Sequence, residues 1–431
     1  MHVIIIGAGT GGLCLAHGLR RAGISVAVYE RDRTRTDGLQ GYRVGISPDG
    51  SRALKTCLPP ELFDTFVATC ARAPVYFNML TEQMDEVLSI PVGNDGDPVN
   101  SEKSVSRMTL RQVLLTGLED IVHFTKTFTR YEQRADGTVT AIFEDGSRAT
   151  GDVLVAADGA NSRVRRQYLP EARQEETGIV SIGGKVPCTP ETKALLSEKI
   201  VHGVTMIMAP KGYGAILHVM EFSPDRPRLL HDTTTDYIMW GFWASRDKFA
   251  VSPPEIPRPQ LLPLASEMTA SWHPNLRALI RQTDPSTLFS INIRTSVPVA
   301  PWPATAVTLL GDAIHTMTPG RGVGANTALR DAALLCRHLM SVRDGRAPLR
   351  QAIGEYEAEM REYGFAAVLE SRKQMDGRSA LHKPVVGRVM LAAMRSGMRF
   401  VNHMPPLKRR MADDQRRFRG ADRSSPQSSS A

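Results

Sequence analysis

The sequence predicts an α/β fold made of two interleaved domains and a set of C-terminal helices. Three observations support this prediction. The chain opens over 2–30 with a strand, a glycine-rich turn, a helix and a second strand. Short strands follow one another over 177–290. A similar order of strand, glycine-rich loop and helix returns over 306–340. At 431 residues the chain is also too long for one ordinary hydrophobic core, so more than one domain is expected.

The composition is that of a globular protein, with 42% hydrophobic and 23% charged residues. No run of about 18 uninterrupted apolar residues marks a transmembrane segment. The chain opens directly on a strand rather than on a signal peptide, so we expect a cytoplasmic protein. The five cysteines are scattered without close pairs, which predicts reduced structural thiols and no metal site.

The net charge of +8 is concentrated at the C-terminus. Residues 372–431 contain 14 Lys or Arg against 4 Asp or Glu, a surplus of ten that leaves the first 371 residues at −2. We therefore expect no nucleic-acid function, and we favour a solvated helix face and tail over contact with acidic lipid or a partner. Closure over a pocket, pairing of subunits and contact with a membrane remain open roles for this basic region.

The first element carries a nucleotide-binding signature. Gly7, Gly9 and Gly12 fit the pattern G-x-G-x-x-G between the strand His2–Ile6 and the following helix. Such glycines permit a tight turn and close approach of the backbone, so a pyrophosphate can lie at the positive end of the helix. Glu30 follows 23 positions after Gly7, where a carboxylate can bind ribose hydroxyls. The segment predicts a Rossmann-like dinucleotide site; glycines that serve packing alone are the alternative.

The following elements alternate between the two domains. Strands over 75–90 begin a second sheet, helical spacing over 107–120 returns to the first domain, and short strands lead to a buried strand over 152–157. From these transitions we assign 1–72, 101–170 and 291–345 to the dinucleotide-binding domain and 73–100 and 171–290 to a mainly antiparallel substrate domain. We assign 346–415 to C-terminal helices and 416–431 to a disordered tail.

Two further motifs indicate which dinucleotide cofactor the chain binds. Asp158-Gly159 follows the buried strand over 152–157, and Gly311-Asp312 follows the strand over 306–311. These segments resemble the DG and GD motifs of the class A flavoprotein monooxygenases, the para-hydroxybenzoate hydroxylase-like family. With the glycine turn, three motifs occur in the family's order between residues 7 and 326.

The resemblance implies FAD as the bound cofactor. The residues that it places against FAD, beside the glycine turn and Glu30, are Asp158, Asp312, Gly324, Ala325 and Asn326. Arg107 resembles the family arginine that contacts FAD, and we favour it over Arg111 one turn later. For Asp158 and Asp312 a helix-capping role is the alternative.

Two residues are expected near the flavin ring. Pro319 resembles the family proline that lies close to the ring where oxygen reacts, with a rigid loop former as the alternative. Arg43 occupies the place after the first β-α-β unit where family members often carry a basic residue near the ring, with a surface arginine as the alternative. The loop departs from the family's Pro-Pro-x-Gly-x-Gly pattern because it contains Arg321, which could orient an acidic substrate or NAD(P)H or face solvent.

The substrate pocket is expected to take its side chains from the second sheet. The aromatic candidates are Phe222, Trp240, Phe242 and Trp243. Alternation along the strand over 237–244 places Trp240 and Phe242 on one face and Trp243 on the other, and the face that contacts substrate is open. His218 is a candidate catalytic proton acceptor or substrate contact, and a structural histidine is the alternative.

The resemblance implies a single-component monooxygenase. NAD(P)H reduces FAD, O2 forms a flavin C4a-hydroperoxide, and the distal oxygen hydroxylates a small, aromatic or polycyclic natural-product-like substrate. No second G-x-G-x-x-G unit is present for a separate nicotinamide domain, so NAD(P)H is expected to bind transiently. A Baeyer–Villiger or epoxidising enzyme is the alternative within the family, and a non-catalytic flavin-binding protein is the alternative outside it. A monomer or homodimer is expected.

Overall fold

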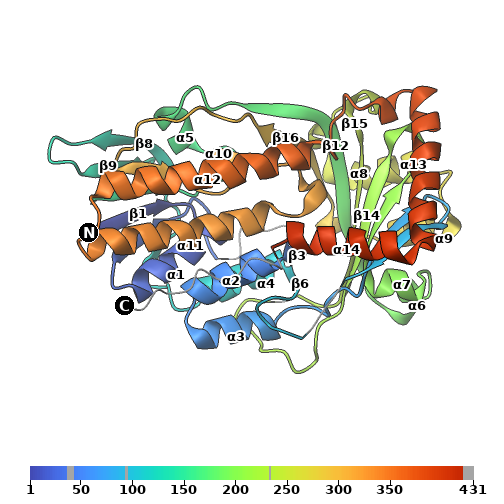
Figure 1. Cartoon of the computed structure of the whole chain (residues 1–431), viewed down its shortest axis with the longest axis horizontal. Coiled ribbons are helices and arrows are strands. Elements are labelled where there is room, and N and C mark those ends of the chain that lie inside the picture. Colours follow the sequence, from blue (N-terminus) through green and yellow to red (C-terminus); the bar gives the residue numbers. More distant parts are fainter. Residues whose placement is uncertain (36–42, 93–95, 233, 421–431) are drawn as a thin grey trace.

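A parallel sheet forms the left part of the molecule in Figure 1. The computed structural model describes residues 1–35, 43–92, 96–232 and 234–420. The five strands of this sheet are, in spatial order, β17 (Val307–Leu309), β11 (Val153–Ala156), β1 (His2–Ile6), β2 (Ser25–Tyr29) and β7 (Val122–His123). Every neighbouring pair is parallel. Strands of this kind are covered on both faces, which is why they read as continuous apolar runs.

Helices from distant parts of the chain pack around this sheet. They are α1 (Thr10–Arg21), α2 (Pro48–Cys57), α3 (Pro60–Ala68), α4 (Arg107–Leu115), α5 (Arg163–Tyr168), α10 (Asp312–His315), α11 (Gly324–Arg343) and α12 (Leu349–Arg372). Two small antiparallel sheets accompany them: β8 (Phe128–Gln133), β9 (Val139–Phe143) and β10 (Arg148–Gly151), and the pair β3 (Arg43–Ile46) and β6 (Lys103–Ser106).

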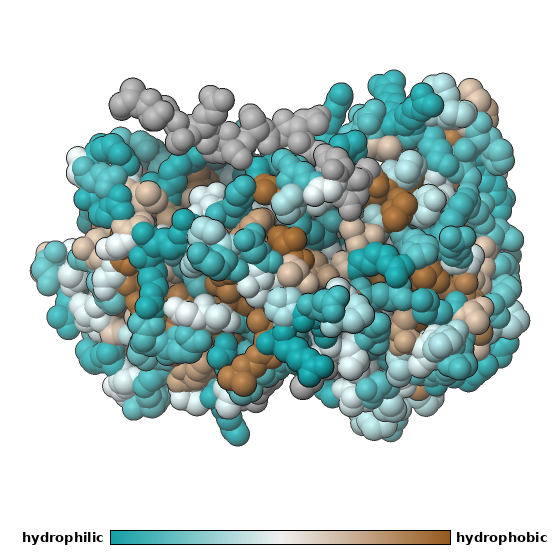
Figure 2. Space-filling view, turned by 90° about the horizontal axis from the view of Figure 1, so that it is seen from below, coloured by the Kyte–Doolittle hydropathy of each residue, from teal (hydrophilic) through white to brown (hydrophobic). Residues whose placement is uncertain are grey.

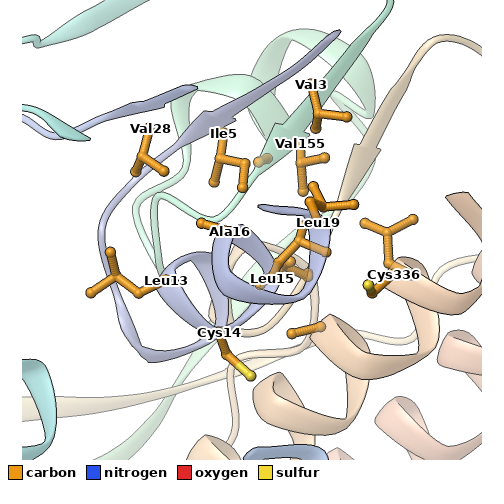
Figure 3. Packing of buried hydrophobic residues seen from close by; sticks show 14 of the residues in the cluster. Val3, Ile5, Leu13, Cys14, Leu15, Ala16, Leu19, Val28, Val155 and Cys336 are labelled. Carbon is orange, nitrogen blue, oxygen red and sulfur yellow. The ribbon is translucent and has the colours of Figure 1, made fainter. Parts of the chain in front are cut away.

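The core of this part lies between α1 and the parallel strands. Figure 3 shows Ala16 and Leu19 of α1 packed beneath the strands that carry Ile5 and Val155. On the other side α1 approaches α11 so closely that a Cβ atom on Gly18 would lie 2.8 Å from the Cys336 sulfur. The glycine therefore serves helix packing, and the approach holds the N-termini of both helices at the same end of the sheet.

A second, mainly antiparallel sheet forms the right part of the molecule in Figure 1. Its seven strands are, in spatial order, β16 (Phe289–Ser296), β12 (Gln174–Pro187), β15 (Tyr237–Ser245), β14 (Gly214–Met220), β13 (Gly203–Met208), β4 (Tyr76–Thr81) and β5 (Glu86–Pro91). Only the pair β13 and β4 is parallel among these neighbours. The predicted α/β fold with a mainly antiparallel second sheet and C-terminal helices is confirmed.

The remaining helices lie against the second sheet or follow it. They are α6 (Pro190–Lys193), α7 (Glu198–Val201), α8 (Arg258–Met268), α9 (Pro274–Arg281), α13 (Val386–His403) and α14 (Pro405–Phe418). Leu261 of α8 and Leu279 of α9 pack with Trp240 and Phe242 in the core of this part. In Figure 1, α13 stands at the outer right edge and α14 runs across the front, between the two sheets.

Two of the predicted boundaries are wrong. β16 spans Phe289–Ser296 and pairs with β12, so the residues from 291 to 296 belong to the second sheet and not to the first. The predicted tail from 416 begins too early, because α14 continues to Phe418 and the Arg419 side chain is paired with Glu102. Residues 421–431 lie outside the described residues. Both errors have one cause: the contacts that order these segments come from residues far away in the chain.

No helix among the described residues has the length and hydropathy needed to cross a membrane.

A buried carboxyl group on α12 predicts a pH-dependent stability. Glu357 is 3% exposed and accepts a hydrogen bond from the Thr308 hydroxyl at 2.8 Å. Burial raises the pKa of Glu357 from 4.5 to about 7. Between these values the folded chain carries a proton that the unfolded chain has lost, so the contribution to stability is full below about pH 4.5 and is lost as pH rises through 7.

We therefore expect Glu357→Gln to be more stable than wild type at pH 8, by up to about 3 kcal/mol, and equal to it near pH 4.5. The measurement is urea unfolding of both proteins across this range. If the free energies of unfolding of the two proteins changed with pH in parallel, the raised pKa of Glu357 would be contradicted.

Candidate functional site

The glycine turn between β1 and α1 is shaped by two of its glycines. Gly7 has φ +107°, and a Cβ atom there would lie 2.4 Å from the Ala157 carbonyl oxygen. A Cβ atom on Gly12 would lie 2.3 Å from the Gly7 carbonyl oxygen. A Cβ atom on Gly9, by contrast, would have no protein atom closer than 3.9 Å. Gly7 and Gly12 therefore allow the turn itself, whereas Gly9 leaves open space above it.

Glu30 lies at the end of β2, beside this turn. It is 8% exposed, and its two carboxylate oxygens accept hydrogen bonds from the main-chain N–H groups of Ala8, at 2.6 Å, and Asp32, at 3.0 Å. The carboxylate thus holds the glycine turn against β2. Contact with a ribose remains a prediction for this residue.

A cavity of about 1210 Å³ lies between the glycine turn and the seven-stranded sheet. The residues that line its first side include Gly9, Gly12, Arg107, Asp312, Pro319, Gly324 and Ala325. Those on the sheet side include Phe77, Met79, Met206, Met239, Trp243 and Phe289. The volume exceeds the roughly 300–1,000 Å³ of pockets that hold one drug-sized molecule, which leaves room for a dinucleotide beside a small second molecule.

Asp312 opens onto this cavity where β17 gives way to α10. Burial among the surrounding residues raises its pKa, while the charges of His315 and Arg107 act in the opposite direction. Arg107 begins α4 and also lines the cavity. Arg111, one turn later, instead forms an ion pair with Asp32 at 2.8 Å. The structure thus brings Arg107, and not Arg111, to the same cavity as Asp312.

A buried network fixes the loop that carries Asp312. The Asp331 carboxylate accepts hydrogen bonds from the Gly311 main-chain N–H, at 2.7 Å, and from the Tyr363 hydroxyl, at 2.6 Å. The same carboxylate lies 2.7 Å from His315 Nε2. Gly311 has φ +61°, a conformation that favours glycine. These contacts aim Asp312 into the cavity.

The loop before α11 forms a further part of the wall. Pro319, Gly324 and Ala325 line the cavity. Within the described part of the chain no side chain caps the N-terminus of α11, so its first N–H groups can bind a ligand. Asn326 does not reach the cavity with its side chain. Its amide accepts from the Ser47 N–H at 2.8 Å and donates to the Gly45 carbonyl at 2.9 Å, and therefore anchors the neighbouring chain.

Asp158 acts as a helix cap in the structure. One carboxylate oxygen accepts from the Arg163 N–H at 2.9 Å, whereas the other is buried without a hydrogen-bond partner among the described residues. Burial raises the pKa of Asp158. Its neighbours Ala157 and Gly159 line the cavity. The capping role is therefore visible, and contact of Asp158 with FAD remains a prediction.

Arg43 lies in the cavity wall at the start of β3. Its Nε donates a hydrogen bond to the Ser104 hydroxyl at 2.9 Å. Burial, together with the charge of Arg419, lowers the pKa of Arg43 to about 10, so the side chain stays positive at neutral pH. Arg419 itself forms a bidentate ion pair with Glu102 next to it. Three charged groups thus meet at this end of the cavity.

His218 is a residue of β14 that lies close to Arg43 of β3, and it is 2% exposed. Its Nδ1 is 3.0 Å from the Gly203 carbonyl oxygen, and its Nε2 has no hydrogen-bond partner among the described residues. Burial and the charge of Arg43 hold its pKa well below 6.5, so the ring is neutral at neutral pH. His218 is therefore a buried neighbour of the cavity rather than part of its lining.

The aromatic candidates divide between cavity and core. Trp243 lines the cavity with Met239, on the same face of β15. Trp240 borders the cavity, but its indole donates to the Thr283 hydroxyl at 2.8 Å within the core. The prediction of Phe242 as a pocket residue is wrong, because the side chain is fully buried in that core.

Phe222, which was also predicted to line the pocket, is not among the residues that line the cavity. Its ring packs against Tyr237, with a distance of 6.2 Å between ring centroids, and the Arg226 guanidinium lies over it. Period-two alternation could separate the two faces of β15, but it could not show which face meets the helices α8 and α9 and which faces the cavity.

The C-terminal helices contribute to the cavity wall, which is one of the roles left open for the basic region of the sequence. Leu391, Met394 and Met398 of α13 and Met411 of α14 line the cavity. Arg419, just after α14, reaches Glu102 across 317 positions of sequence. No local pattern reports such contacts. They make the C-terminal helices a wall of the cavity.

The residues present fit FAD. The N-terminus of α1 is not capped by a side chain of the described residues, and it lies at one end of the cavity, where it can receive a pyrophosphate. Asp312 can accept hydrogen bonds from ribityl or ribose hydroxyls further along. The free N–H groups at the start of α11 can stabilise negative charge on the flavin.

Comparison with known proteins also supports FAD as the cofactor. An FAD-binding domain model matches residues 105–371, and an NAD(P)-binding Rossmann-like domain model matches residues 5–44. The dual O-methyltransferase/FAD-dependent monooxygenase CTB3 of Cercospora beticola is 33% identical over 392 residues, which are 83% of this chain and 44% of the relative. The chain thus spans less than half the length of the dual-function relatives that it matches.

Other relatives match over nearly their whole length. The FAD-dependent urate hydroxylase of Klebsiella pneumoniae is 30% identical over 385 residues, covering 87% of this chain and 90% of the relative. The crystal structure of Klebsiella pneumoniae HpxO complexed with FAD and uric acid has a TM-score of 0.74 and 25% identity, and covers 95% of this chain and 96% of its own. The chain belongs to the FAD-dependent monooxygenases of the para-hydroxybenzoate hydroxylase-like class.

Proposed function

We propose that the chain is a single-component monooxygenase that takes electrons from NAD(P)H and uses O2 to hydroxylate a small, apolar, aromatic or polycyclic molecule. One observation carries this proposal. The same cavity is bounded by the glycine turn and Asp312 on one side and by apolar side chains of the seven-stranded sheet on the other. The cofactor and the substrate would therefore lie side by side in one cavity, as oxygen transfer from a flavin requires.

Four groups of this chain would hold FAD. Gly9 and the N-terminus of α1 would bind the pyrophosphate, Arg107 and Asp312 would bind the middle of the cofactor, and the segment Gly324–Ala325 would face the flavin. When bound, FAD supplies the transfer of electrons from NAD(P)H and the activation of O2. Glu30, Asp158 and the main chain of Asn326 remain proposed contacts around these groups.

The substrate would lie against the face of the sheet that carries Met239 and Trp243. This wall is rich in methionine, aromatic and branched aliphatic side chains, which exclude water and suit an apolar ring system. Urate, named for the Klebsiella relative, is small and polar. The apolar wall therefore favours a larger and more hydrophobic substrate for this chain.

Arg43 would orient a polar group of the substrate or the flavin ring, since it is the positive side chain of β3 at this end of the cavity. Pro319 would keep the loop before α11 rigid next to the ring. His218 would help to position Arg43 and would not contact the substrate, because its ring is buried and neutral. None of these roles needs a nucleophile.

The test is a screen for substrate-stimulated oxidation of NAD(P)H by the FAD-loaded protein. We expect slow oxidation alone and faster oxidation with a suitable apolar aromatic compound, whose product gains one oxygen atom by mass. NMR of the product separates hydroxylation from ring expansion or epoxidation. A preparation that binds FAD but transfers no oxygen to any apolar or polar aromatic compound would contradict the proposal.

A further inference from the structure

The outward face of α13 is apolar and is left exposed by the rest of the described chain. Val386, Val389, Met390 and Phe400 are 53%, 67%, 41% and 60% exposed. Their spacing places them on one side of the helix. Leu391, on the inner side, is buried in the cavity wall. Elsewhere, on the face shown in Figure 2, the surface is mostly hydrophilic with hydrophobic residues in small groups, so an apolar stripe along one helix calls for a partner.

The surroundings of this stripe are strongly basic. Residues 377–412 contain eight Lys or Arg and no Asp or Glu. Arg388 and Arg399 on α13 and Arg409 and Arg410 on α14 are exposed. Met404, just before α14, and Leu407 on α14 continue the exposed apolar surface. We define the docking face as the exposed side chains of residues 385–410.

We propose that the docking face binds an anionic lipid bilayer, with its apolar side chains in the interface and its arginines against the headgroups. A second copy of the chain would bring the four exposed arginines of this face to the same place a second time, so charge disfavours a dimer through this face. An anionic membrane matches both the apolar stripe and the positive charge around it, because amphipathic basic helices lie in the plane of the membrane interface.

The position of α13 gives this binding a consequence for the enzyme. Leu391, Met394 and Met398 on its inner side line the cavity, while its outer side would meet the lipid. One helix thus separates the cavity from the bilayer, and an apolar substrate could be drawn from the membrane. This consequence rests on the proposed function, whereas binding to vesicles does not.

The experiment is co-sedimentation of the full, FAD-loaded chain with vesicles. Mixed phosphatidylcholine–phosphatidylglycerol vesicles are compared with pure phosphatidylcholine vesicles, each at low and high salt. We expect at least tenfold tighter binding to the mixed vesicles at low salt, and a loss of that difference at high salt.

Two pairs of substitutions test the face itself. The double variants Val389→Asp/Phe400→Asp and Arg388→Glu/Arg399→Glu should each weaken binding to mixed vesicles by at least tenfold. The matched controls are Val251→Asp, at an apolar residue 51% exposed elsewhere, and Arg134→Glu, at an exposed hairpin arginine; both should bind like wild type. Circular dichroism and FAD content verify that all variants fold.

Three outcomes would overturn the proposal. The first is wild-type protein that ignores mixed vesicles. The second is Val389→Asp/Phe400→Asp binding as tightly as wild type, which would leave only unspecific charge attraction. The third is a wild-type dimer in solution that this double variant abolishes, with no lipid binding, which would make a second copy the occupant.

Discussion

Replacing Gly9 by alanine should leave the chain folded and weaken FAD binding roughly 5- to 150-fold, the effect of an overpacking cost of about 1–3 kcal/mol. Gly9 has φ −80°, which alanine adopts freely, and its Cβ atom would meet no protein atom within 3.9 Å. The added methyl group would instead occupy space at the N-terminus of α1, where the pyrophosphate must approach the backbone. Fluorescence titration of flavin-free protein with FAD measures the affinity, and thermal melting without FAD measures the fold.

Gly12→Ala is the matched control, because the two glycines belong to one turn and differ in what surrounds them. A Cβ atom on Gly12 would lie 2.3 Å from the Gly7 carbonyl oxygen and 3.0 Å from the Ala157 Cβ. This variant should lower the melting temperature of the protein even without FAD. Equal FAD affinity in Gly9→Ala and wild type would contradict a pyrophosphate site at this turn.

Asp312→Ala should weaken FAD binding by roughly 10- to 150-fold, since a hydrogen bond to a charged group contributes about 1.5–3 kcal/mol. The carboxylate opens onto the cavity beside Arg107, at the carboxyl end of β17, where cofactors of open α/β sheets bind. Asp312→Asn keeps one acceptor oxygen and should fall between wild type and Asp312→Ala. Retention of FAD after gel filtration, with the titration above, gives the order of the three proteins.

The control for this series is Asp344→Ala, which removes an exposed carboxylate that pairs with Arg343 and Arg346 away from the cavity. It should retain FAD like wild type. Glu30→Ala should also lose FAD, in part because the carboxylate positions the glycine turn through the Ala8 N–H. Unchanged flavin content in both Asp312→Ala and Glu30→Ala would refute these assignments.

The residues predicted on the cofactor side follow from local determinants in the sequence. The spacing of Gly7, Gly9 and Gly12 encodes a turn whose crowding appears directly in the structure. Gly311-Asp312 likewise marks the end of a strand. Arg107 and Arg111 could be ranked only by resemblance, because their difference depends on Asp32, which lies far away in the chain.

The substrate side was predicted less well because it depends on packing between distant elements. Alternation separates Trp243 from Phe242, but the helices α8 and α9 decide that Phe242 is core. Asn326 matches the family motif, yet its side chain holds the main chain at Ser47 and Gly45. A residue type in a motif therefore identifies a place in the fold better than it identifies the direction of the side chain.

Closure of the C-terminal region over the pocket could be named only as one of three open roles, because it also depends on contacts between distant residues. Arg419 follows a basic, polar segment that resembles a disordered tail, and only its pairing with Glu102 shows that it is ordered. The apolar residues of α13 serve two faces, so their helical pattern alone does not distinguish the cavity wall from the docking face.

The most direct test of the central claim, oxygen transfer within the shared cavity, is a reaction under ¹⁸O₂ in ordinary water. The FAD-loaded protein, NAD(P)H and a substrate found by the screen should yield a product that contains one ¹⁸O atom. A product whose new oxygen comes from water, or consumption of NAD(P)H that yields only hydrogen peroxide beside unchanged substrate, would contradict the account.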